Sequence, residues 1–231
     1  ARCGSLPSHW LTRLLMLRSD VISRWWPSTQ SLDLVEGSVT VVAHAVQTEV
    51  TRFLKGKALA ASWRSFSSLD VAFQSVPEFV NVPTAYLVLP PHSRWTVVWN
   101  NSFLCDGYDT LCWNLTARHR LSTVHWHASD GDTTFQAGAT FHHRRWDGAA
   151  VVERRVQATR QDNQWLFFEE GQPLAEEVVA NYRARRKRDR LNEVEMMALL
   201  ARLGASPWSE AFYAIPEQQC FALEQLDLPS H

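Results

Sequence analysis

The residues best suited to chemistry in this 231-residue chain lie close together, between Asn100 and His143. The stretch combines cysteine, aspartate and histidine side chains, from which proteins build thiol nucleophiles, general bases and metal ligands. It completes no sequence motif of a catalytic or ligand site. Any site here therefore depends on which predicted helices and strands position these side chains.

Cys105 directly precedes a predicted helix over 106–118, and a predicted strand carrying His125 and His127 follows that helix. A helix N-terminus lowers the pKa of a thiol and favours the nucleophilic thiolate. The order of cysteine, helix and histidine strand resembles the arrangement of papain-like cysteine hydrolases. This resemblance implies Cys105 as nucleophile and one of the two histidines as base.

The same resemblance requires a polar residue that orients the histidine, and Gln136 or Asn100 could fill that role. The competing interpretation is an inert, buried Cys105, since cysteine is among the most buried residue types. Phe103, Leu104 and Tyr108 around the cysteine are typical packing residues and favour burial.

The histidines also allow a weaker, metal-binding interpretation based on His125, His127 and His142. Asp130-Gly131 is a strong two-residue turn signal between strands predicted over 121–128 and 133–143. A hairpin centred there pairs His125 with Gln136, which leaves His142 too far away for a compact triad. We therefore expect no metal site.

The hairpin shows a clean two-residue alternation of apolar and polar side chains. We expect Trp126, Phe135 and Phe141 to be buried on its core face, with the histidines on the opposite face. The eleven tryptophans along the chain indicate a core rich in large aromatic residues.

The predicted elements from residue 84 onward indicate an α+β fold. We expect a mainly antiparallel sheet with a strand–helix–strand unit in the middle and helices at the C-terminal end. The predicted strands cover 84–89, 94–99, 121–128, 133–143, 151–160 and 164–169, and the predicted helices cover 106–118, 174–186 and 193–203. A parallel strand pair could flank the helix over 106–118.

We interpret residues 1–231 as one domain, in which 174–231 forms a helical C-terminal portion packed on the sheet. Residues 1–80 are the hardest part to assign, because 39–54 fits either a strand or a helix. A hairpin with 58–66 is one solution. Ser67 or Ser68 then provides an N-cap for a short helix over 69–76.

Composition and charge narrow the function classes. The formal net charge of −1 gives no bulk attraction to nucleic acid, and no apolar run is long enough for a membrane helix. Four cysteines are too few for a disulfide scaffold, which favours a cytoplasmic protein with reduced thiols. No cofactor fingerprint is present.

The basic run over 183–190 is the sharpest charge cluster. We interpret it as a solvated helix end that pairs with carboxylates, and expect no specific nucleic-acid binding. The carboxylates expected to pair with it are Glu169, Glu170, Glu176 and Glu177.

Two classes of function remain. The first is a non-enzymatic protein-binding module, such as a bacterial immunity-type protein that neutralises a toxin. The second is a cysteine-dependent hydrolase centred on Cys105. Because no catalytic constellation is complete, the sequence ranks binding to another protein first. It leaves the oligomeric state open.

Overall fold

The computed structural model describes residues 31–55, 57–76, 84–102, 108–129, 131 and 137–226. Within these residues it contains one sheet of nine strands, in the order β2-β9-β3-β4-β1-β5-β6-β7-β8. The strands are β1 (Ser31–Glu36), β2 (Leu59–Arg64), β3 (Ala85–Leu89), β4 (Trp95–Asn100), β5 (Thr123–Ser129), β6 (Gly138–Trp146), β7 (Val151–Gln161), β8 (Gln164–Glu170) and β9 (Cys220–Gln225).

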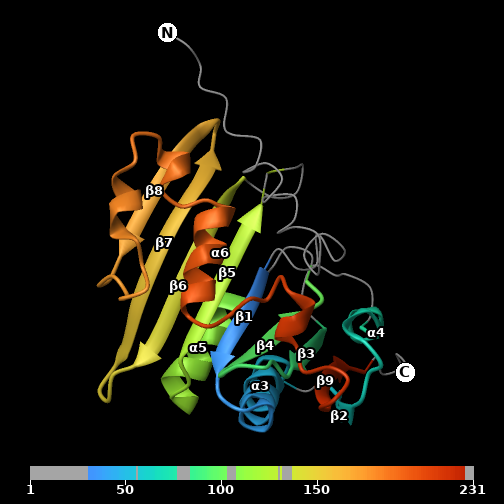
Figure 1. Ribbon diagram of the computed structural model, residues 1–231. Helices are drawn as coiled ribbons and strands as arrows, with labels where there is room; N and C mark the ends of the chain where they lie inside the picture. The colour runs from blue at the N-terminus through green and yellow to red at the C-terminus, as the bar shows by residue number, and fades with distance from the viewer. Residues whose placement is uncertain are drawn as a thin grey trace.

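The described helices cover the two faces of this sheet. They are α3 (Val39–Phe53), α4 (Leu69–Gln74), α5 (Tyr108–His119) and α6 (Glu193–Arg202), with 3₁₀ turns η1 (Val179–Arg183), η2 (Lys187–Asp189) and η3 (Glu210–Phe212). The apolar residues of α4 and α6 pack into one core cluster, and those of α3 and α5 pack into a second. Figure 1 shows α6 crossing the sheet in front, with α3 and α5 behind its lower part. The expected α+β fold is confirmed.

Every strand pair in the sheet is antiparallel. The strand–helix–strand unit is β4–α5–β5, but β4 and β5 do not pair with each other. Strand β1 lies between them and pairs with both. The possible parallel pair is therefore wrong, because a strand from the N-terminal part of the chain fills the position.

Both ends of the chain hold elements that the sequence pattern left unassigned or misassigned. Residues 39–53 form helix α3, so the hairpin solution is wrong, and the buried strand β1 precedes this helix. Helix α4 begins after Ser68, whose side chain accepts from the N–H of Val71 as expected of an N-cap. In the C-terminal portion, β9 is a buried strand between β2 and β3, so 174–231 is not uniformly helical.

The helix expected over 174–186 is also wrong, because only a 3₁₀ turn forms at η1. The buried Glu177 carboxylate accepts from Arg154 of β7, from the Leu174 N–H and from the Tyr182 hydroxyl. This carboxylate fixes the segment in an irregular path against the sheet. Helix α6 begins at Glu193, and its N-cap Asn192 accepts from the Glu195 N–H.

The hairpin of β5 and β6 does not turn tightly at 130–131. Ser129 pairs with Gly138, so the connection spans 130–137 and the partner of His125 is His142 instead of Gln136. The register moves by six residues. An even shift leaves each side chain on its expected face. Trp126 and Phe141 are accordingly buried as expected, and Phe135 lies outside the described residues.

Tryptophans contribute to the core, but not all of them. Trp95, Trp99, Trp126 and Trp208 are buried, whereas Trp63 and Trp113 are more than two-fifths exposed. No described helix is long and apolar enough to cross a membrane.

Candidate functional site

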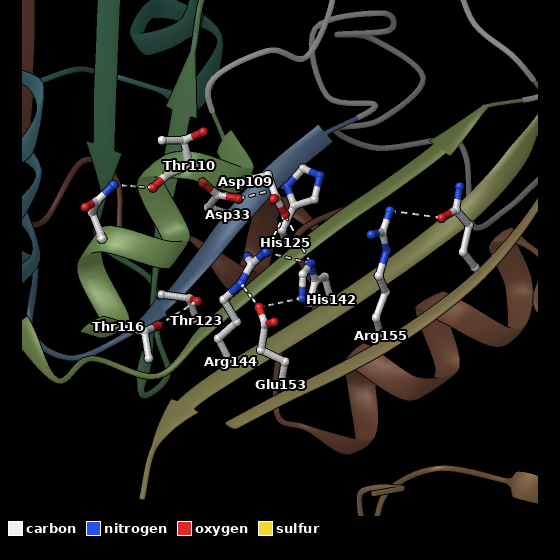
Figure 2. A network of polar contacts seen from close by, with 12 residues as sticks. Asp33, Asp109, Thr110, Thr116, Thr123, His125, His142, Arg144, Glu153 and Arg155 are labelled. Atoms are coloured by element: carbon white, nitrogen blue, oxygen red, sulfur yellow. Dashed lines mark hydrogen bonds and ion pairs between the residues drawn. The ribbon is translucent and has the colours of Figure 1, made fainter. Parts of the chain in front are cut away.

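A row of polar residues crosses the face of the sheet that α5 covers. Asp33 of β1 stands opposite His125 of β5, His125 opposite His142 of β6, and His142 opposite Arg155 of β7. Residues directly opposite in antiparallel strands share a face and lie about 5 Å apart at Cβ. Figure 2 shows Asp33, His125 and His142 near Asp109 of α5, Arg144 and Glu153, whereas Arg155 lies apart and donates to Gln157.

The first half of this cluster is a buried aspartate–histidine pair. The Asp33 side chain is fully buried, and its Oδ1 lies 3.0 Å from Nδ1 of His125. The His125 side chain is itself mostly buried, with 12% of its surface exposed. A carboxylate in this position accepts the Nδ1 proton and leaves Nε2 as the basic nitrogen.

Two opposing effects set the proton affinity of Asp33. Burial raises the pKa of its carboxyl above the ordinary value, whereas the hydrogen bond and charge of His125 lower it. The Cys112 thiol of α5 and the positive charge of Arg144 also lower the pKa of Asp33. The Asp33 carboxyl thus interacts with His125 of β5, with Cys112 of α5 and with the charge of Arg144 of β6.

The second half of the cluster is centred on Arg144, whose side chain is only 2% exposed. Its Nε donates to Glu153 at 2.6 Å and one terminal nitrogen donates to Asp109 at 2.5 Å. The hydrogen bond with His142 and the Arg144 guanidinium hold the pKa of Asp109 well below its ordinary value. Since Asp109 lies in the first turn of α5, these contacts fix the start of that helix against β6.

His142 is enclosed by the same groups. Its Nδ1 lies 2.7 Å from the Arg144 guanidinium and its Nε2 lies 3.0 Å from Glu153. The same Nδ1 also lies 3.1 Å from the Asp109 carboxylate, so the ring stands between one cation and two carboxylates. His142 therefore serves as a linker in the ion-pair network.

These contacts correct one argument against a metal site and supply another. His142 is not remote from His125, as the tight turn predicted, but directly opposite it. However, both ring nitrogens of His142 contact charged side chains, and the nearest of these is a cation, which opposes binding of a metal ion. The described residues contain no group of three or more ligand side chains that could hold a metal.

The structure places the residues proposed from the sequence as follows. His125 and His127 share the α5 face of β5. Asn100 is buried at the end of β4, and its Oδ1 accepts from the Ser102 N–H. Cys105 and Gln136 lie outside the described residues. Among the described residues, the group that hydrogen-bonds to Nδ1 of His125 is Asp33.

Sequence reasoning missed Asp33, Asp109, Arg144 and Glu153 as members of a site. One signal was present for Asp33, which alternates with the apolar residues Leu32 and Leu34 in a short strand-like run. A charged residue inside such a run is buried only when it has a partner. That partner is 92 residues away in the chain, beyond the reach of any local pattern.

No protein-family model, curated protein or solved structure matches the chain.

Proposed function

We propose that the protein is a hydrolase in which His125, held by Asp33, acts as the general base. The observation that carries this proposal is the 3.0 Å contact between a fully buried Asp33 carboxyl and Nδ1 of His125, whose side chain is 12% exposed. A buried carboxylate fixes the tautomer and orientation of the ring and stabilises the imidazolium that forms during proton transfer. Its place in the cluster matches the orienting role that the cysteine-hydrolase interpretation required.

The nucleophile in this proposal is Cys105. In the chain it precedes Asp109 by four residues, and Asp109 is a member of the cluster. The two described cysteines are poor alternatives. Burial raises the thiol pKa of Cys112 well above its ordinary value and that of Cys220 to about 12. A thiol with a raised pKa and no exposure neither ionises nor meets a substrate.

The reaction class that follows is acyl transfer to water. His125 accepts the Cys105 proton at Nε2, the thiolate attacks a carbonyl carbon, and the leaving group departs with that proton. Water then hydrolyses the thioester with His125 again as base. The contribution of Asp33 is to keep the imidazole in the correct tautomer throughout.

The test is the rate at which iodoacetamide alkylates Cys105 in the native protein, followed by peptide mass spectrometry between pH 5 and 9. We expect rapid labelling at pH 6, because a histidine-paired thiol is ionised well below its ordinary pKa. His125→Gln and Asp33→Asn should each slow the labelling at pH 6 by tenfold or more.

The matched control is His119→Gln. This histidine also pairs with a buried carboxylate, Glu49, at 2.9 Å, but it belongs to the far end of α5. It should leave the labelling rate of Cys105 unchanged. If Cys105 alkylates slowly in the native protein and His125→Gln has no effect, the hydrolase proposal is wrong.

A non-enzymatic protein-binding module is the second candidate, and one observation favours it. Strand β8 ends the sheet, and its Leu166 and Phe168 side chains are each more than two-fifths exposed on the same face. An edge strand with exposed apolar residues is a common docking surface for another chain. A partner captured by this surface, such as a toxin in the immunity-type reading, should be lost on Phe168→Ser and retained on Cys105→Ala.

A further inference from the structure

The basic run lies on the other face of the sheet from the candidate site. Trp165 and Phe167 of β8 alternate with Leu166 and Phe168, so they point away from the face that α5 covers. Turn η2 packs against this side of β8, as the orange segment beside β8 in Figure 1 shows. An open cavity of about 370 Å³ lies there, lined by Trp165, Arg186, Lys187 and Arg188.

The cations in this cavity lack the partners that the sequence suggested. Glu169 and Glu177 pair with Arg154 instead. Within the described part of the chain, the ion pair formed by the run is that of Arg188 with Asp189, at 3.5 Å between two half-exposed side chains. Such a pair contributes little. Arg186 and Lys187 therefore face the cavity with their charges uncompensated by a described carboxylate.

The backbone holds these cations together. The Asp189 N–H bonds to the Arg186 carbonyl and the Arg190 N–H to the Lys187 carbonyl, which closes a tight turn. The Arg190 side chain anchors the turn, since it donates to the Ala184 carbonyl and lies over the Phe167 ring. Three adjacent like charges repel one another, and a multiply charged anion removes that repulsion when it binds.

We propose that this cavity binds a nucleoside triphosphate, with the phosphates on Arg186, Lys187 and Arg188 and the base against the Trp165 ring. The cations supply charge-assisted hydrogen bonds to phosphate oxygens, and an indole ring offers a stacking surface for a planar base. The cavity of about 370 Å³ is open to solvent, so a phosphate chain can reach the cations from outside. The site is independent of His125 and of the hydrolase proposal.

The experiment is calorimetric titration of the full chain at physiological salt with ATP, AMP and tripolyphosphate. We expect saturable binding with ATP about tenfold tighter than AMP, because AMP lacks two charged groups. Tripolyphosphate should bind severalfold more weakly than ATP, because it has no base. Trp165→Ala should make ATP and tripolyphosphate bind equally well, whereas Trp165→Phe should keep ATP the tighter ligand of the two.

Charge-matched variants test whether the cavity or the general basic charge is responsible. Arg186→Gln with Lys187→Gln should weaken ATP binding about tenfold or more. Arg183→Gln with Arg185→Gln removes the same charge from exposed positions of the run that do not line the cavity, and should change affinity less than twofold. An unchanged urea midpoint shows that each variant is folded.

Three results would overturn the proposal. The first is no saturable ATP binding up to several millimolar. The second is equal weakening in both double variants, which indicates diffuse electrostatic attraction. The third is a single-stranded oligonucleotide that displaces ATP at physiological salt and binds more tightly than it, which would assign the site to nucleic acid.

Discussion

Removing the Arg154 side chain should lower the free energy of unfolding more than removing an exposed charged side chain does. Arg154 lies on β7, on the face of the sheet away from the candidate site, and its side chain is 3% exposed. Its Nε and one terminal nitrogen donate to the Glu177 carboxylate at 2.9 and 2.7 Å, and the other terminal nitrogen donates to the Gly171 carbonyl at 3.0 Å. The Glu177 side chain is fully buried.

The expected magnitude follows from what remains after Arg154→Met. Glu177 keeps two donors, the Leu174 N–H and the Tyr182 hydroxyl, both at 2.8 Å, but no positive charge. Burial and the bond to Glu177 raise the pKa of Tyr182, so its hydroxyl stays a donor. Breaking a buried ion pair costs about 3–5 kcal/mol, and the two remaining donors favour the lower end.

The assay is urea unfolding followed by tryptophan fluorescence and circular dichroism. The double variant Arg154→Met with Glu177→Gln removes both charges and should be less destabilised than the sum of the single variants, by about 2 kcal/mol. The control is Arg155→Met, one residue along β7 and exposed on the opposite face, which should change stability by less than about 0.5 kcal/mol. A cost below about 1 kcal/mol for Arg154→Met would refute the reasoning.

Two further predictions concern the sheet itself. Trp126→Ala should destabilise the protein by about 3–5 kcal/mol in the same urea assay, because the indole is 1% exposed, and a cost near 1 kcal/mol would contradict its place in the core. Burial and the neighbouring Arg145 lower the pKa of His143 to about 4, so the unfolded chain binds a proton at higher pH than the folded one. The free energy of unfolding should therefore fall by roughly 2–3 kcal/mol as the pH drops from about 6.5 to 4. The free energy of unfolding of His143→Gln should change less with pH over the same range.

Local patterns in the sequence determined the type and facing of many elements. The alternation around Trp126 and Phe141 assigns the core face of the hairpin, because side chains of a strand alternate strictly. The cap residues Ser68 and Asn192 mark the starts of α4 and α6, because their side chains satisfy free N–H groups of the first turn. These interactions span a few residues and can be predicted without knowledge of the rest of the chain.

The pairing partners were decided only by the tertiary structure. The sequence contains a strong turn signal at 130–131, yet β5 and β6 pair six residues further along, which places His142 opposite His125. Burial of Trp126 beside Phe141 is compatible with both registers, since both keep the same face inward. The turn motif alone therefore could not select between them.

The candidate site depends on the same long-range pairing. Strand β1 inserts between β4 and β5 and brings Asp33 to His125, and β7 brings Glu153 to Arg144. In the C-terminal part, the helix-like spacing over 174–186 gives way because Glu177 satisfies a buried cation on β7. Helical propensity contributes tenths of a kcal/mol per residue, whereas an unpaired buried charge costs several, so the tertiary contact prevails.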